Sequence, residues 1–104
     1  IETFQQLDLR TGKILECRRV KESDKLLVSQ VDLGEENPRS IVSGVAEFYQ
    51  PEEMVGRSVI IVANLKPVKL RGERSEGMIL ATDDGETVKI VEAPADTLPG
   101  TVVR

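Results

Sequence analysis

The stretch AEFYQPEEMVG, residues 46–56, contains the one convincing helix in a sequence that is otherwise typical of strands and turns. Pro51 suits the first turn of a helix, because its missing N–H would have no helical partner there. Glu52 and Glu53 favour the positive N-terminal end of the helix dipole. Gly56 is a stop signal, so we expect a short helix.

Three strands are predicted before this helix. Residues 7–20 alternate between apolar and polar positions and then shift phase, which indicates a β-bulge at Gly12. Residues 25–34 also alternate and end in turn-forming residues, so the first two strands form a hairpin. Residues 39–45 form a third strand, broken by Gly44.

Two or three further strands are predicted after the helix. Residues 58–63 are a continuous β-branched apolar run, which indicates a strand buried on both sides. Residues 76–82 and 86–93 form a hairpin around the turn DDG at 83–85. The tail from Pro94 onwards is expected to be irregular.

This order of elements predicts the fold class. Three strands, a short helix and further strands, without an internal repeat, are expected of a Greek-key barrel of the OB type. A small β-sandwich is the alternative, but a helix between the third and fourth strands can plug one open end of a barrel. Thr3 and Gln6 have capping-box spacing and predict a helical turn before the first strand. The sequence therefore predicts an all-β, five-stranded OB-fold barrel in a single domain, residues 1–104.

Composition favours binding over catalysis. The chain has no histidine and one cysteine, Cys17, which excludes an internal disulfide, the usual zinc ligand sets and histidine-activated nucleophiles. No G-x-S-x-G motif is present, so we expect no catalytic site, no metal and no cofactor. No apolar run reaches the ~18 residues of a membrane span, and the unpaired cysteine indicates a reducing, cytoplasmic location. The start at Ile1, without a signal-like segment, suggests a fragment of a longer protein.

Positive charge is concentrated in NLKPVKLRGERSEGM, residues 64–78, although the net charge is -4. Four basic residues lie between Lys66 and Arg74, opposed only by Glu73. Pro67 fixes one φ and Gly72 permits a sharp bend, so the cations sit on a constrained segment. A cationic binding rim and an ordinary solvated loop both fit this pattern.

A second basic stretch covers residues 9–25, and in an OB barrel the loop between the first two strands lines the nucleic-acid groove. The two basic stretches could therefore meet. Phe4, Phe48 and Tyr49 are the only aromatic residues, too few for a base-stacking platform. If the chain binds nucleic acid, we expect it to contact phosphates and to recognise the shape of a folded RNA.

Six motifs, in order along the chain, resemble those of the tRNA-binding domain family: LDLRTGKI, DKLL, VDLG, IVSGVAEFYQPEEMVG, VIIVANLKPVKLRG and SEGM. The resemblance runs from about Phe4 to Val103. The family includes the C-terminal domain of many methionyl-tRNA synthetases, free-standing tRNA-binding proteins, the endothelial-monocyte-activating polypeptide domain and a bacterial secretion chaperone. Residues 51–72 and 99–104 are most similar to the methionyl-tRNA synthetase branch.

The resemblance implies an auxiliary domain that binds tRNA with little sequence preference and raises the tRNA affinity of a methionyl-tRNA synthetase, fused to it or separate. Catalysis is expected in that other portion. The expected tRNA contacts are Arg10, Lys13, Lys25, Ser43, Asn64, Lys66, Lys69, Arg71, Arg74, Ser75 and Met78. The cations would contact phosphates, and Asn64, Ser43 and Ser75 would hydrogen-bond to backbone or RNA. Met78 is either core filler or a soft contact for a base or an apolar partner.

A protein-interaction or chaperone module on the same fold is the competing interpretation. It would bind polypeptide in an apolar groove, for which Leu65, Leu70 and Met78 are the candidate exposed residues. A homodimer is expected from the family. It is also expected from the apolar tail TLPGTVV, residues 97–103, which is too short to form a core and needs a surface to cover.

Overall fold

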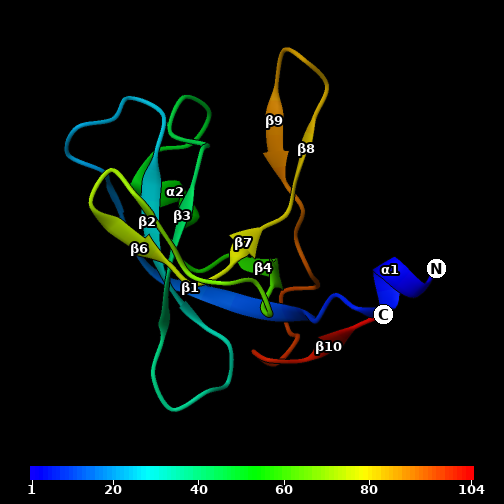
Figure 1. The fold of residues 1–104 in the computed structure, drawn as a ribbon. Coiled ribbons are helices and arrows are strands. Elements are labelled where there is room, and N and C mark those ends of the chain that lie inside the picture. Colours follow the sequence, from blue (N-terminus) through cyan, green and yellow to red (C-terminus); the bar gives the residue numbers. More distant parts are fainter.

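The sheet is built around β1, which spans Leu9–Arg19 in the computed structural model of residues 1–104 (Figure 1). The main path is antiparallel, in the order β3-β2-β1-β4-β7. These strands span Leu27–Asp32 (β2), Arg39–Ser43 (β3), Ser58–Val62 (β4) and Met78–Ile79 (β7). The first half of β1 pairs with β4 and the second half with β2, so one long strand connects both parts of the barrel.

The barrel closes where β3 meets the residues that precede β7. The backbone N–H of Glu76 donates to the carbonyl of Ser40 at 2.8 Å. The N–H of Val42 donates to Oγ of Ser75 at 2.9 Å, so a side chain takes the place of a backbone acceptor. The five strands thus form one nearly closed sheet, which confirms the expected OB-type barrel and excludes the sandwich.

The bulge in β1 lies at Leu15, because the register with β2 shifts between Ile14 and Glu16. The predicted bulge at Gly12 is therefore wrong. Gly12 is regularly paired with β4, but a Cβ there would lie 2.6 Å from Cγ1 of Val31. The glycine is needed because the strand passes this core side chain at close range.

The short helix α2, Pro51–Met54, lies between β3 and β4 as predicted. Its capping box is formed by Gln50 and Glu53, whose carboxylate accepts the Gln50 N–H at 2.8 Å. The side chain of Met54 is fully buried in the main core cluster, so the helix closes the barrel from one side. All five residues of β4 are buried, as expected from its β-branched run.

The chain ends lie together at one side of the molecule (Figure 1). The helix α1 spans Glu2–Gln5 and has Ile1 as its N-cap, so Thr3 lies inside the turn and the predicted capping box is wrong. The tail also ends in a strand, β10 (Val102–Val103), which pairs with β1. The expectation of an irregular tail is therefore wrong at its end. A Cβ on Gly100 would collide with the carbonyl of Leu33, so the tail is packed tightly onto the barrel.

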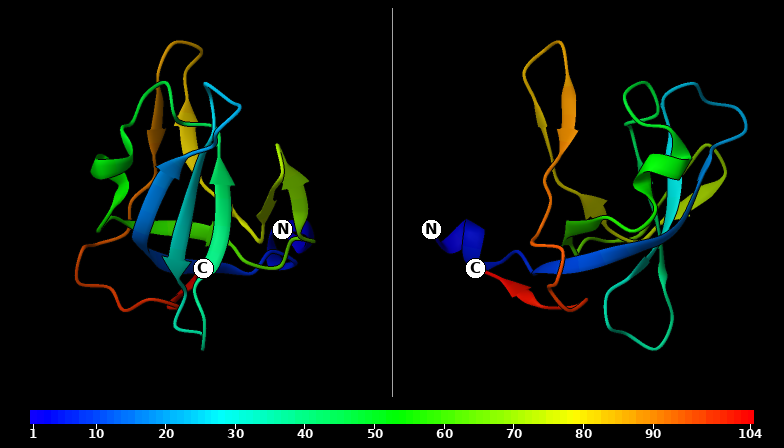
Figure 2. Two further views of the ribbon diagram at one scale, coloured as in Figure 1. Left: turned by 90° about the vertical axis from the view of Figure 1, so that its left-hand side faces the viewer. Right: turned by 180° about the vertical axis from the view of Figure 1, so that it is seen from behind.

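Two hairpins form separate two-stranded sheets outside the main sheet (Figure 2). The hairpin of β8 (Ala81–Asp83) and β9 (Val88–Ile90) is the one predicted around DDG. The hairpin of β5 (Val68–Leu70) and β6 (Glu73–Ser75) lies in the basic segment, where only a constrained stretch was expected. None of the helices has the length and apolar character needed to span a membrane.

Candidate nucleic-acid interface

Residues 65–75 form the basic arm, in which β5 and β6 are joined by a two-residue turn. Leu70 pairs with Glu73, so only Arg71 and Gly72 make the connection. Both have positive φ, 50° for Arg71 and 83° for Gly72, as a type I′ turn requires. Gly72 adopts this conformation without steric cost, whereas it strains Arg71. The sharp bend expected at Gly72 is confirmed.

The ladder of the basic arm places two positive charges directly opposite each other, on Lys69 and Arg74. Like charges in this position destabilise a strand pair. Neither residue forms an ion pair, nor do Lys66 and Arg71, and all four side chains are exposed. The arrangement costs stability and leaves concentrated positive charge free for an anionic partner.

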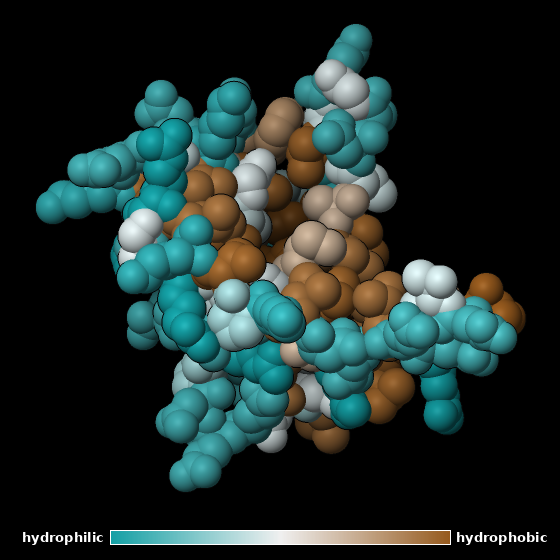
Figure 3. Space-filling view, in the orientation of Figure 1, coloured by the Kyte–Doolittle hydropathy of each residue, from teal (hydrophilic) through white to brown (hydrophobic).

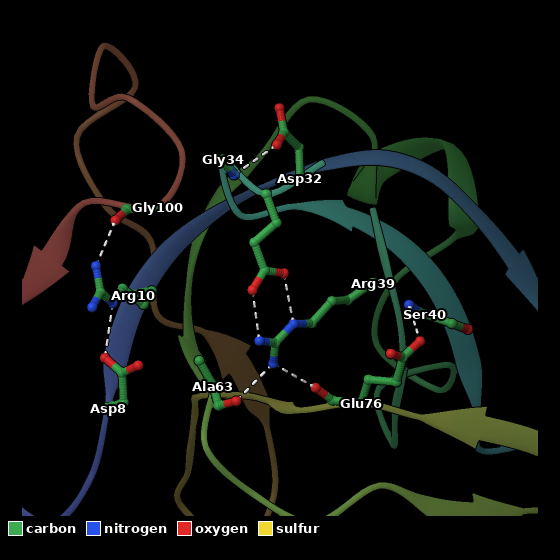
Figure 4. A network of polar contacts seen from close by, with 10 residues as sticks. Asp8, Arg10, Asp32, Gly34, Arg39, Ser40, Ala63, Glu76 and Gly100 are labelled. Atoms are coloured by element: carbon green, nitrogen blue, oxygen red, sulfur yellow. Dashed lines mark hydrogen bonds and ion pairs between the residues drawn. The ribbon is translucent and has the colours of Figure 1, made fainter. Parts of the chain in front are cut away.

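Arg39 fastens both ends of the arm to β3 (Figure 4). Its Nη1 donates to the carbonyls of Ala63 at 2.6 Å and Glu76 at 3.0 Å, which flank the arm. Glu35 accepts two hydrogen bonds of 2.8 Å from the same guanidinium. These bonds lower the pKa of Glu35 and raise that of Arg39. The arm therefore has a fixed base.

Arg39 is not among the residues predicted from the sequence. Its two carbonyl partners lie 24 and 37 positions away along the chain, so no local pattern points to them. The only local signal is the i,i+4 spacing of Glu35 and Arg39, which is common on any exposed segment.

Asn64 ties the start of the arm to the N-terminal segment. Its Oδ1 accepts the N–H of Asp8 at 3.0 Å, and its Nδ2 donates to the carbonyl of Gln6 at 2.7 Å. Both the oxygen and the nitrogen of the amide thus have a backbone partner, which agrees with the expectation that Asn64 hydrogen-bonds to backbone. A contact between Asn64 and RNA stays a prediction.

Arg10 lies beside the tail, in a polar cleft of about 370 Å³ (Figure 4). Residues 64–76 do not contribute to the lining of this cleft. Its guanidinium contacts Asp8 at 2.8 Å and the carbonyl of Gly100 at 3.2 Å. Arg10 therefore holds the tail in place, and the structure does not bring it together with the cations of the arm. Its contact with tRNA stays a prediction.

The basic strand β1 and the basic arm meet through an ion pair of 3.0 Å between Arg18 and Glu73. This contact is where the two basic stretches of the sequence come together. Lys25 lies exposed in the loop between β1 and β2, and Lys13 is exposed on β1 beside Ser58 of β4. Both are available to solvent, and their roles stay predictions.

The two predicted serines differ in their hydrogen bonding. Ser75 is buried, and its Oγ accepts the N–H of Val42 at 2.9 Å and donates to the carbonyl of Gly77 at 3.1 Å. Ser75 thus helps to close the barrel. The Oγ of Ser43 is buried without any hydrogen-bond partner. Met78 is about half exposed, at 47%, and is not core filler.

An apolar groove of about 340 Å³ runs between the basic arm and the barrel. It is lined by Val42, Leu65, Lys66, Val68, Leu70, Ser75, Gly77 and Met78. Figure 3 shows hydrophobic surface between the positions of β6 and β7, bordered by hydrophilic side chains on the side of β6. The residues predicted as a possible apolar surface, Leu65, Leu70 and Met78, are thus brought together here.

Other reactive groups do not form a site. Burial raises the pKa of the Cys17 thiol, which disfavours the nucleophilic thiolate. No group of three or more acidic or cysteine side chains is arranged to hold a metal ion. The chemistry that the surface offers is therefore binding of anions by the arm and of apolar groups by the groove.

Comparisons with known proteins show the relationship of the chain. Residues 9–102 match the family model described as "Putative tRNA binding domain". A methionine–tRNA ligase from Methanocella arvoryzae is 53% identical over 105 residues, which cover 100% of this chain and 15% of that protein. The chain therefore spans a small part of such a relative.

Two solved structures are similar over nearly the whole chain. A MetRS related protein from Pyrococcus horikoshii has a TM-score of 0.92 and 31% identity, over 99% of this chain and 94% of that one. Chaperone CsaA from Bacillus anthracis has a TM-score of 0.89 at 23% identity, over 99% and 95%, and shares the fold. From the family match and the Pyrococcus relative, the chain belongs to the tRNA-binding domain family.

Proposed function

We propose that residues 1–104 form one domain that binds tRNA by laying its phosphates across the basic arm. The observation that carries this proposal is that four exposed cations without ion-pair partners lie on the basic arm, whose base is fixed. Such cations release counterions from RNA when they bind phosphate. The base, held by Arg39 and Asn64, limits the conformational entropy that binding would otherwise cost.

The wider interface takes in the other predicted contacts whose side chains are accessible, Arg10, Lys13, Lys25, Asn64 and Met78. The hydroxyls of Ser43 and Ser75 are buried and are left out of it. Phosphate contacts position an RNA without reading its sequence. Unrelated tRNAs should therefore bind within about tenfold of one another. A strong preference for one anticodon would contradict this part of the proposal.

The domain would serve a methionyl-tRNA synthetase in the cytoplasm as an auxiliary tRNA clamp, either fused to the catalytic portion or separate from it. The identity to a methionine–tRNA ligase supports this assignment. A second binding module raises overall affinity through effective concentration and need not change the chemical step. Removal of the domain should therefore raise KM for tRNA and leave kcat nearly unchanged.

Binding of total tRNA at several salt concentrations tests the role of the arm. The variant Lys69→Gln with Arg74→Gln removes two facing cations, and Lys89→Gln with Arg104→Gln is a control with the same charge change far along the chain. At about 1 kcal/mol for each contact, the arm variant should bind roughly 30-fold more weakly. The slope of log affinity against log salt concentration should be less steep by about 1.8, because two phosphate contacts are lost and each contributes ~0.9.

The control pair and the folded state decide the interpretation. The control should bind tRNA nearly as the unchanged chain does. The arm variant should melt no earlier, because it relieves repulsion between neighbouring charges. Equal losses in both variants would mean that only net charge matters, and an early-melting arm variant with unchanged affinity would make the cluster structural.

We also propose that the domain is a homodimer. The tail has a surface within its own chain, since Val103 packs against the cluster of Leu9, Ile60 and Val62. The apolar tail therefore does not by itself require a partner subunit. However, large apolar side chains of both termini stay exposed: Ile1, Phe4, Leu7, Leu98 and Val102. The strand β10 pairs only with β1, so its other edge is open to a second copy.

Polypeptide binding is the second candidate function, and the apolar groove beside the arm is the observation that favours it. An extended apolar peptide could bury its side chains against Leu65, Leu70 and Met78. The shared fold with a chaperone supports no more than the architecture. Competition between total tRNA and an unfolded client peptide separates the two candidates.

A further inference from the structure

Four large apolar side chains are exposed in the groove beside the basic arm. Leu65 and Leu70 are each 41% exposed, Met78 is 47% exposed and Val68 is 53% exposed. All four line the same groove. Exposed apolar side chains that gather in a groove with a polar rim are a common feature of binding sites.

The hairpin separates charge from apolar surface. Val68 and Leu70 alternate with Lys69 along β5, and they line the groove, whereas Lys69 and its partner Arg74 do not. Lys66 is the one cation in the groove lining, and no acidic side chain is part of it. The groove is therefore an apolar slot with one cation, Lys66, in its lining, and the charges of Lys69 and Arg74 lie on the other face of the same hairpin.

We propose that this groove receives an unpaired nucleobase of the RNA whose phosphates the arm binds. This inference rests on the proposed function and adds a requirement to it: the RNA must offer a nucleotide outside a continuous duplex. A base carries a flat, apolar face on a charged backbone. A phosphate held by Lys66 would place that face against Leu70 and Met78.

Size and charge favour this occupant. The volume of about 340 Å³ is near the lower end of the ~300–1,000 Å³ typical of ligand pockets, which suits one planar group. A base in a duplex cannot enter, because its faces are stacked and its edge is paired. An apolar peptide would match the lining but would leave Lys66 and the neighbouring cations of the arm without a counterpart. The complementary charge of an RNA backbone decides between them.

The base would be held without an aromatic platform. The groove lining contains only aliphatic and thioether side chains beside Lys66, Ser75 and Gly77. These side chains can cover a base face by burial of apolar surface, and the thioether of Met78 makes favourable contacts with aromatic rings. Such contact does not distinguish the four bases, so the groove selects unpaired nucleotides rather than a sequence.

A pair of RNA probes with equal numbers of phosphates tests the proposal. One is a stem–loop with 2-aminopurine in its loop, and the other is a continuous blunt duplex. The groove variant Leu70→Ala with Met78→Ala keeps all four cations. Leu15→Ala with Val55→Ala is the matched control, because these two side chains are equally exposed but do not line the groove.

The groove variant should bind the stem–loop about fivefold more weakly, the lower end of the range known for bases stacked on aromatic side chains, and should bind the duplex unchanged. The 2-aminopurine fluorescence should rise when the unchanged chain binds, because the base leaves its stack, and this rise should be lost in the groove variant. The Leu15/Val55 control should resemble the unchanged chain with both probes. If the groove variant is unfolded, Met78→Gln alone serves, with the same expected difference between probes.

The outcomes separate this inference from the proposed function. Equal affinity losses for both probes, or no loss for either, would overturn the base-binding groove. The variant of Lys69 and Arg74 should weaken both probes, and if it weakens neither, the proposed function itself fails. An extended apolar peptide that loses affinity in the groove variant, while the stem–loop does not, would assign the groove to polypeptide and overturn the inference.

Discussion

Replacing Arg71 by Asn should strengthen the turn of the basic arm and weaken tRNA binding at the same time. Arg71 has a φ of 50° in a two-residue turn, followed by Gly72. Asn is several-fold enriched at positive φ, and Asn-Gly is the preferred pair for a type I′ turn. The substitution therefore relieves backbone strain and removes one positive charge that has no ion-pair partner.

The gain in stability follows from the conformational preference. A several-fold preference for Asn corresponds to about 0.5–1 kcal/mol. Part of this gain reaches the global fold, because Arg39 bonds both ends of the arm to β3. We expect Tm to rise by up to ~4 °C in a domain of this size, and exchange of the arm amides to slow roughly twofold or more.

The loss in affinity follows from the chemistry of the guanidinium. A charge-assisted, bidentate contact with phosphate contributes about 1.5–2 kcal/mol, so tRNA affinity should fall roughly 10- to 30-fold. Arg71→Lys keeps the charge without the planar fork and should lose less. Filter binding with total tRNA, together with thermal unfolding, measures both effects. A lower Tm would refute the turn assignment, and unchanged affinity would remove Arg71 from the interface.

Three further predictions test the fold around the site. In the Arg39→Gln variant, the free energy of unfolding should fall less as the pH drops below 4.5. The pKa of Glu35 is lowered by Arg39, so this pair contributes stability that is present above the ordinary value of 4.5 and is lost as the pH falls through the folded pKa. Urea unfolding from pH 3 to 6 measures the difference. Gly100→Ala should destabilise by about 2 kcal/mol or more, seen as a drop in Tm, because φ is 83° and a Cβ would meet a backbone carbonyl. Leu98→Asp with Val102→Asp should yield folded monomers in sedimentation at micromolar concentration, whereas a monomeric unchanged chain would contradict the dimer.

Local chemistry in the sequence was sufficient for the helix and the main strands. Pro51, the two following acids and Gly56 define α2 through backbone geometry and the helix dipole, which act within a few residues. The run at Ser58–Val62 is buried on both faces because every residue is apolar or small. The cationic segment was also visible, because charge density is a property of composition.

The tertiary structure alone decided how these parts become a site. The strands β5 and β6 have three residues each, too short for an alternating pattern, and their turn uses Arg-Gly in place of a recognised pair. The groove exists because β6 packs against β3, which also contacts β7, and its lining comes from positions 42 to 78 of the chain.

The sequence by itself determined which side chains are charged, apolar or rigid, and these properties identified the OB barrel and its basic segment. It did not determine the contacts of Arg39 with Ala63 and Glu76, the pairing of β10 with β1, or the need for a glycine at position 12. Each of these joins segments far apart along the chain. Such contacts depend on how the whole barrel closes, because only closure brings the two backbones within hydrogen-bonding or packing distance.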